Sequence, residues 1–124
     1  MRVGCEWIVD AFNCDSQILR NEAILRDVFS LIISDLELNV IEQSWYCFPG
    51  AGGITGLALL SESHLACHTY PEYKIATFNL YCCNQRPEWE WEFNLKRFLR
   101  AEKVRVVFIQ RGGIKPSLRT IESI

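Results

Sequence analysis

The segment LLSESHLACHTYPE, residues 59–72, brings together two carboxylates, several hydroxyl groups, a thiol and the only two histidines of the chain. An imidazole titrates near neutral pH and can move protons, and a thiol next to a suitable base can act as a nucleophile. Two kinds of chemical site fit these residue types: a metal centre and a Cys–His nucleophile pair. A third interpretation stays open, in which both histidines are hydrogen-bonded parts of a turn.

The spacing favours neither chemical site. A metal ion could be held by His64, Cys67, His68 and either Cys82 or Cys83. The spacing His-x3-His suits a helix, but nothing in this segment predicts a helix, and no Cys-x-x-Cys pair supports it. A nucleophile pair could join Cys67 or Cys83 to His68, but sequence separation does not establish that contact.

Ser63 and His68 are separated by an odd number of positions. In one continuous strand, such a spacing places two side chains on opposite faces of the sheet. If both serve one site, we expect the chain to bend between them. The dipeptide Tyr70-Pro71 favours extended or turn structure and is compatible with a bend nearby.

The composition indicates one domain, residues 1–124, with 49% hydrophobic residues and a net charge of −2. Basic residues are densest over 96–105, where acids border them, which indicates a solvated helix face and no nucleic-acid partner. No signal peptide or membrane-spanning stretch is recognisable, and the six cysteines are too few for a disulfide scaffold. We therefore expect a cytoplasmic protein with mostly buried, reduced cysteines and no membrane partner.

Hydrophobic periodicity predicts the elements that must position these residues. Strands are expected over 5–12, 38–48, 54–63, 73–83 and 103–110, and helices over 15–35 and 86–102. Candidate caps of the first helix are Asn13, Asp15 and Ser16, and the second helix is expected to carry Pro87, Glu88 and Glu90 near its start. Residues 49–53 are predicted as a loop, and residues 111–124 as a partly disordered tail.

This order predicts an α+β fold, a two-layer sandwich in which two helices cover one face of a mainly antiparallel sheet. The other face also carries apolar residues and needs a partner. Homodimerisation is the simplest way to cover it.

The run S-E-S-H, then H-T-[WY]-P-E, then a cysteine fifteen residues after the histidine of the second motif resembles the prokaryotic S-adenosylmethionine decarboxylase proenzymes. The similarity is strongest over 53–83 and weaker at Gly4, Asp10 and Cys14. Members of that family are small pyruvoyl-dependent enzymes that cleave themselves. No metal is implied.

The resemblance implies cleavage between Glu62 and Ser63. Ser63 would attack the carbonyl of Glu62, and the ester formed would break down to a β chain, 1–62, and an α chain, 63–124, with a covalent pyruvoyl group at position 63. His68 matches the histidine that removes the α-proton, and Thr55 stands where a serine hydroxyl assists processing. Cys83 matches the proton donor of the decarboxylation, while Cys82 is expected to face the opposite side of the strand.

The resemblance also implies a small amino-acid substrate that forms a Schiff base with the pyruvoyl group. Tyr70 and Phe48 match aromatic positions that stack on adenine, and Glu72 matches the carboxylate that holds the ribose hydroxyls. The expected assembly is a homodimer of cleaved protomers. The expected reaction is decarboxylation of S-adenosylmethionine in polyamine biosynthesis.

Several positions depart from the family pattern. Glu6 stands where histidine is common, Asn79 where aspartate is common, Thr55 replaces serine, and the 49–53 loop is longer. An extra acid such as Glu6 could pair with a guanidinium or ammonium group, so a pyruvoyl-dependent arginine or ornithine decarboxylase stays open as an alternative. A further alternative is a non-catalytic paralogue that regulates an active enzyme and keeps the Glu62–Ser63 bond intact.

Overall fold

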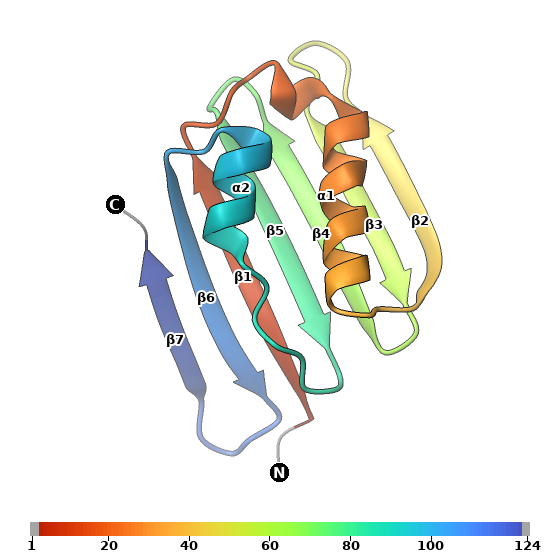
Figure 1. The fold of residues 1–124 in the computed structure, drawn as a ribbon, viewed down its shortest axis with the longest axis vertical. Helices are drawn as coiled ribbons and strands as arrows, with labels where there is room; N and C mark the ends of the chain where they lie inside the picture. The colour runs from red at the N-terminus through yellow and green to blue at the C-terminus, as the bar shows by residue number, and fades with distance from the viewer. Residues whose placement is uncertain (1–2, 123–124) are drawn as a thin grey trace.

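A single sheet of seven strands forms the centre of the protein in a computed structural model that describes residues 3–122. The spatial order is β2-β3-β4-β5-β1-β6-β7, and every neighbouring pair is antiparallel. Figure 1 shows that the first strand lies inside the sheet, between β5 and β6. The strands are β1 Gly4–Phe12, β2 Val40–Cys47, β3 Ile54–Leu60, β4 Ser63–Tyr70, β5 Ile75–Cys82, β6 Lys103–Arg111 and β7 Ser117–Glu122.

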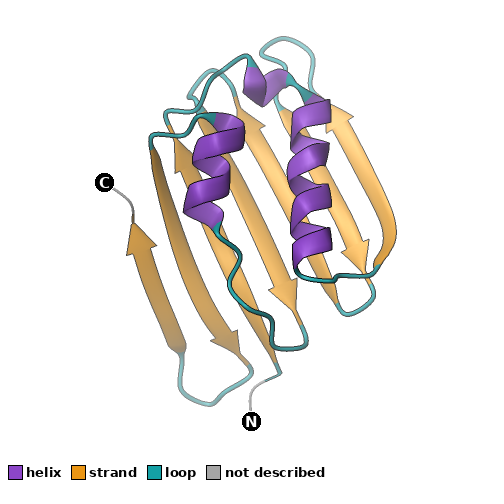
Figure 2. Ribbon diagram, in the orientation of Figure 1, coloured by secondary structure: helices purple, strands orange, loops and turns teal. Residues whose placement is uncertain are grey.

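Two helices cover one face of this sheet, and both lie on the same side (Figure 2). Helix α1 spans Glu22–Asp35 and follows a short 3-10 turn, η1, Ile18–Arg20; helix α2 spans Trp91–Leu99. The predicted α+β two-layer sandwich with a mainly antiparallel sheet is confirmed.

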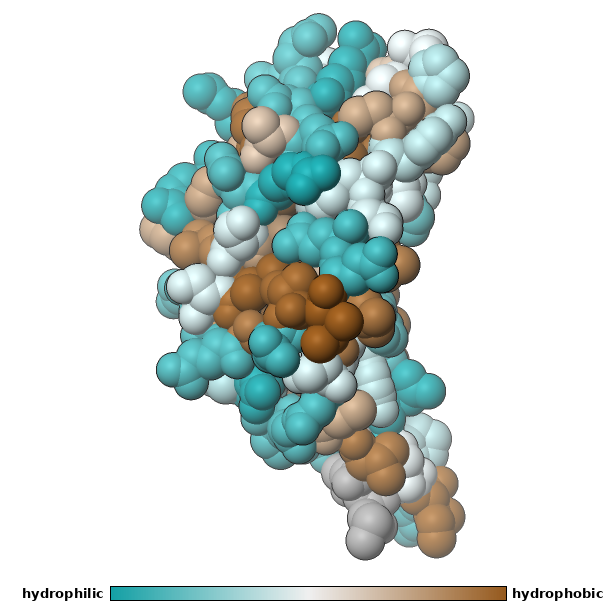
Figure 3. Space-filling view, turned by 90° about the vertical axis from the view of Figure 1, so that its right-hand side faces the viewer, coloured by the Kyte–Doolittle hydropathy of each residue, from teal (hydrophilic) through white to brown (hydrophobic). Residues whose placement is uncertain are grey.

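The core forms between the helices and the inward-facing side chains of the central strands. Strand alternation sends every second residue of β4 into this layer, so Leu65, Cys67 and Thr69 are buried. His64 and His68 lie on the opposite, open face together with Tyr70. The open face has no covering layer within residues 3–122 and includes the exposed Leu57 and Leu59. Figure 3 views the molecule from the side of β2 and shows hydrophobic residues gathered at its centre.

The prediction of a bend between Ser63 and His68 is wrong. Residues 63–70 form one regular strand that pairs on both sides without a register shift. The hydroxyl and imidazole side chains that suggested a turn occupy the open face and the sheet end, where polar groups stay solvated. The predicted third strand accordingly ends at Leu60, and a two-residue turn, Ser61–Glu62, leads into β4.

The C-terminal segment forms a strand, although the sequence predicted a partly disordered tail; residues 123–124 lie outside the described residues. Strand β7 pairs with β6 from Ser117↔Gln110 to Glu122↔Arg105. Its side chains are nearly all exposed, so it lacks the hydrophobic alternation that identifies a half-buried strand.

Both helices begin later than predicted. Asn21 caps α1 by accepting a hydrogen bond from the amide of Ile24, whereas the Asp15 side chain accepts from the amides of Gln17 and Ile18 where the 3-10 turn begins. Before α2, Trp89 and Trp91 are both buried. Two side chains at this spacing reach the same core only from extended backbone, so the segment that contains Pro87, Glu88 and Glu90 lies outside the helix.

Candidate active site

The Glu62–Ser63 peptide lies at the exit of the β3–β4 hairpin. Leu60 and Ser63 face each other across the two strands, so Ser61 and Glu62 form the turn. The amide of Ser61 donates to the carbonyl of Asn39 at 2.9 Å, which fixes the entry into the turn. Glu62 is exposed and Ser63 is half-buried. The peptide expected to be cut is therefore an accessible bond with a defined geometry.

The residues that follow β5 bind Glu62 in two ways. The backbone N–H of Cys83 donates to the carbonyl oxygen of Glu62 at 2.8 Å. The side-chain amide of Asn84 donates to the Glu62 carboxylate. A donor on that carbonyl polarises it and would stabilise negative charge that develops on its oxygen during attack. The sequence did not single out Asn84, because its role depends on a contact with a residue 22 positions away.

Cys82 lies directly beside Ser63 in the sheet. The two residues are paired across β4 and β5, and the hydrogen bond from the Cys83 amide to the Glu62 carbonyl lies next to the pair. Ser63 and Cys82 therefore form a non-hydrogen-bonded pair, in which the two side chains lie close together. Burial raises the pKa of the Cys82 thiol to about 11, and nearby Cys5 adds to this, while Arg86 and a side-chain hydrogen bond with Ser63 lower it. Cys82 is therefore a protonated thiol in the helix-covered layer, whereas Cys83 is exposed.

The other predicted site residues come together at the opposite end of β4. Phe48, Thr55, His68, Tyr70 and Glu72 line one cavity of about 520 Å³. Thr55 and His68 are paired on β3 and β4, and Thr55 Oγ1 lies 3.0 Å from Nδ1 of His68. Phe48 and Tyr70 are 52% and 40% exposed, so their ring faces are available to a flat ligand. This cavity has the size and the mixed apolar and polar lining of a small-molecule site.

The structure thus separates the predicted site residues into two groups. Glu62, Ser63 and Cys83 lie at one end of β4, and the cavity with His68 lies toward the other. His68 is five positions after Ser63 along the strand, a distance of about 17 Å at the usual rise per residue. Within one chain, His68 does not reach Ser63.

The two unusual residues Glu6 and Asn79 contact each other on the open face. The Asn79 side-chain amide donates to Glu6 Oε2 at 2.7 Å, and Arg111 forms an ion pair with Glu6 Oε1. The carboxylate only accepts, so the Asn79 oxygen faces Nε2 of His64 at 3.1 Å. Both oxygens of Glu6 are therefore engaged, and Asn79 in place of an aspartate avoids two adjacent carboxylates.

The alternative chemical sites find no support in the geometry. Cys67 faces the helices while His64 and His68 face the open side, so they share no site. Burial also raises the pKa of Cys67 to about 12, which opposes thiolate formation. Across residues 3–122, no group of three His, Cys, Asp or Glu side chains is arranged to hold a metal ion. No helix in the described part of the chain is long and apolar enough to cross a membrane.

Comparisons with known proteins indicate the family and the fold of the chain. The family model described as S-adenosylmethionine decarboxylase matches residues 5–112. The S-adenosylmethionine decarboxylase proenzyme of Pyrobaculum aerophilum is 32% identical over 111 residues, covering 89% of each chain. That of Picrophilus torridus is 30% identical over 119 residues, covering 94% of this chain and 91% of the relative. A crystal structure of the adenosylmethionine decarboxylase from Aquifex aeolicus superimposes with a TM-score of 0.77 at 22% identity, over 92% of this chain and 94% of that one.

The match to the family model spans most of the chain, and the relatives align over nearly their whole length. The structural likeness adds an independent agreement in fold. The chain therefore belongs to the S-adenosylmethionine decarboxylase family, a family of carboxy-lyases.

Proposed function

We propose that this chain is a pyruvoyl-dependent S-adenosylmethionine decarboxylase that makes its cofactor by cleaving itself between Glu62 and Ser63. The observation that carries the proposal is the hydrogen bond from the Cys83 amide to the Glu62 carbonyl. That carbonyl belongs to the peptide that Ser63 must attack, and it already has a donor aligned on its oxygen.

The residues around the peptide fit the first step of processing. The Ser63 hydroxyl adds to the Glu62 carbonyl carbon, and the bond between that carbon and the Ser63 nitrogen then breaks as the nitrogen takes up a proton. The product is an ester between Glu62 and the Ser63 oxygen. The Cys83 amide stabilises the oxyanion that forms in between, and the position of Glu62 in a two-residue turn leaves room for the shift.

The pyruvoyl group supplies an electron sink for decarboxylation of an α-amino acid. The cavity at the other end of β4 provides the groups that suit a nucleoside. Phe48 and Tyr70 offer aromatic faces for stacking on adenine, and the exposed carboxylate of Glu72 can accept hydrogen bonds from ribose hydroxyls. Cys83, exposed next to the cleavage site, is the proposed proton donor.

We further propose that the active site forms between two copies of the chain. A face-to-face dimer covers the open face of each sheet, and a two-fold axis near the middle of β4 would bring the cavity of one chain to Ser63 of the other. His68 of the partner subunit would then act on the α-proton of residue 63. In this arrangement His68 of the partner subunit can act on residue 63, although Ser63 and His68 of one chain lie about 17 Å apart.

The decisive experiment is complementation between inactive chains. Ser63→Ala and His68→Ala variants, tagged differently, are expressed separately and together, and cleavage is followed by mass spectrometry under denaturing conditions. We expect neither variant to be cleaved alone, and the His68→Ala chain to be cleaved when its partner supplies His68. A His68→Ala chain that stays whole in the mixed sample contradicts the shared site. A wild-type chain that stays whole contradicts self-cleavage and favours the regulatory paralogue.

The substrate is tested on the cleaved protein by release of CO2 from S-adenosylmethionine, arginine and ornithine. We expect release from S-adenosylmethionine, because Glu6 does not line the cavity and already pairs with Arg111. Release from arginine or ornithine alone would overturn this assignment while leaving the self-cleavage intact.

A further inference from the structure

Arg86 is a half-buried arginine that forms no ion pair with any acid of residues 3–122. It lies in the loop between β5 and α2, and its Nε is buried without a hydrogen-bond partner. One terminal nitrogen, Nη1, donates to the carbonyl of Gln85 at 3.3 Å. Among residues 3–122, no carboxylate forms an ion pair with Arg86. Asp35 and Glu37 line the same cavity as Arg86 without forming an ion pair with it, so the partly desolvated guanidinium keeps hydrogen-bond donors for a further anion.

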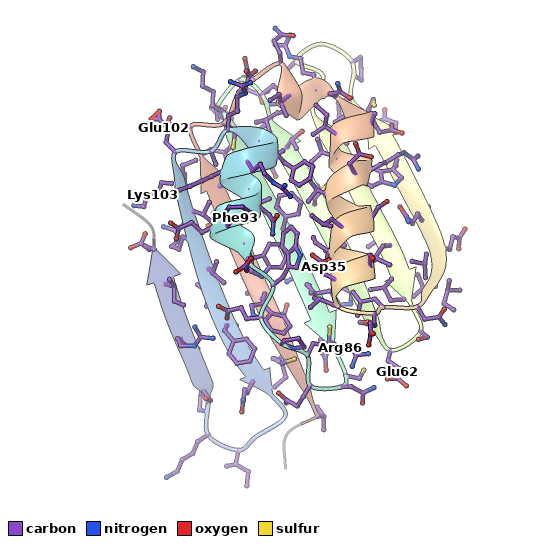
Figure 4. All side chains as sticks on the ribbon, in the orientation of Figure 1. Asp35, Glu62, Arg86, Phe93, Glu102 and Lys103 are labelled. Carbon is purple, nitrogen blue, oxygen red and sulfur yellow. The ribbon has the colours of Figure 1, made fainter. Side chains whose placement is uncertain are left out.

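The loop that carries Arg86 is also the loop that binds Glu62. Cys83 holds the Glu62 backbone carbonyl, and Asn84 holds the Glu62 carboxylate. Figure 4 shows the Arg86 and Glu62 side chains at the same end of the molecule, near the turn that joins β3 and β4. Arg86 is only two residues beyond Asn84, which keeps its long side chain within this neighbourhood.

The charge of Arg86 also acts on two buried thiols of the strands near Ser63. Although burial raises the pKa values of the Cys5 and Cys82 thiols, the positive charge of Arg86 acts on both in the opposite direction. Cys82 is paired with Ser63 in the sheet. Cys82 lies in the helix-covered layer, opposite to the open face that carries the histidines, so the charge of Arg86 acts on that side of the sheet next to Ser63.

We propose that Arg86 receives the carboxylate that self-cleavage creates at Glu62. The inference rests on the proposed cleavage between Glu62 and Ser63. In the ester formed by the acyl shift, a base removes the α-proton of residue 63, and the bond between Cβ and the ester oxygen breaks. The electron pair of that bond stays on the oxygen, so Glu62 leaves as a carboxylate and a double bond forms between Cα and Cβ of residue 63. Water then replaces the nitrogen of residue 63, which departs as ammonia.

This step changes the charge at the turn. The uncut Glu62 has one carboxylate, held by Asn84, and the cleaved Glu62 has two. A guanidinium can bind a carboxylate through two parallel hydrogen bonds, and its attraction grows as negative charge builds on the leaving oxygen. Arg86 thus favours departure of Glu62 and afterwards holds the new end of the β chain in place.

The test compares Arg86→Gln and Arg86→Lys with a matched control, Arg26→Gln, whose arginine pairs with Glu22 on the exposed side of α1. Newly made precursor of each variant is followed by intact mass, and hydroxylamine is added to trap any accumulated ester. We expect Arg86→Gln to lower the rate of pyruvoyl formation about tenfold or more and to accumulate hydroxylamine-sensitive ester. Arg86→Lys should recover most of the rate, and Arg26→Gln should behave as wild type.

A second measurement separates this role from a purely structural one. The melting temperature of each variant is compared in the cleaved protein and in a Ser63→Ala background that cannot be cut. We expect Arg86→Gln to lower the melting temperature of the cleaved protein by several degrees more than that of the uncut protein, since only the former has the new carboxylate. Equal losses in both backgrounds, or a wild-type cleavage rate without ester, would overturn the inference. Failure of the wild-type chain to cleave would instead refute the proposed function on which it rests.

Discussion

Thr69→Val is a sharp test of the structure beneath the cavity. Thr69 is 4% exposed, and its hydroxyl donates to the carbonyl of Leu19 at 2.7 Å while it accepts from the amide of Ile54 at 2.9 Å. A single oxygen therefore joins η1, β3 and β4 next to the loop that begins at Phe48. Valine keeps the shape of the side chain and removes both hydrogen bonds.

The expected loss follows from the burial of the two partners. Leu19 and Ile54 are 0% and 1% exposed, so water does not replace the missing hydroxyl. Each buried group left without a partner costs roughly 1–3 kcal/mol. The added methyl group offsets part of this, and we expect the free energy of unfolding to fall by about 3 kcal/mol. For a domain of this size, the melting temperature should fall by roughly 10 °C.

The assay is urea unfolding followed by tryptophan fluorescence, in the Ser63→Ala background and at one protein concentration so that cleavage and assembly stay constant. Thr77→Val is the matched control, because Thr77 is half-buried and its hydroxyl makes only a 3.5 Å contact with the His68 carbonyl. The control should change stability by about 0.5 kcal/mol or less. A Thr69→Val variant that is no less stable than this control refutes the reasoning.

Three further predictions concern the cysteines and the open-face network. Cys83→Ala should still be cleaved but lose clean turnover through faulty protonation, measured by product analysis; the same loss in Cys82→Ala instead would reverse the assignment. Burial raises the pKa of the Cys67 thiol from an ordinary 9.0 to about 12, because the folded state favours the neutral thiol. This preference contributes fully to stability below pH 9, and the contribution is lost as the pH rises toward 12. Urea unfolding at increasing pH should show a smaller fall in the free energy of unfolding for Cys67→Ala than for the parent protein. Asn79→Asp should lower stability by about 1–2 kcal/mol by opposing Glu6, and combining it with Glu6→His should recover much of the loss in a double-mutant cycle.

The fold class was predictable because its signals are local. The repeated apolar positions between Leu25 and Ile32 lie on one helix face and are buried as expected. Strand β7 escaped prediction because a strand exposed on both faces has no hydrophobic alternation. Strand β4 escaped prediction because its polar residues suggested a turn, although in the structure they alternate between the two faces of the sheet.

The sequence by itself determined which groups are available: a Glu-Ser bond, two histidines, two adjacent cysteines and the aromatic and acidic residues of one segment. The available groups follow from residue identity and short sequence spacing, which do not depend on the fold. Only the tertiary structure decided their grouping. Strand alternation sent Ser63 and His68 to opposite faces, and pairing between β4 and β5 brought Cys83 and Asn84 into contact with Glu62. Such contacts join residues about twenty positions apart, and their register is set by the packing of the whole sheet, because a shift of one residue would exchange its two faces.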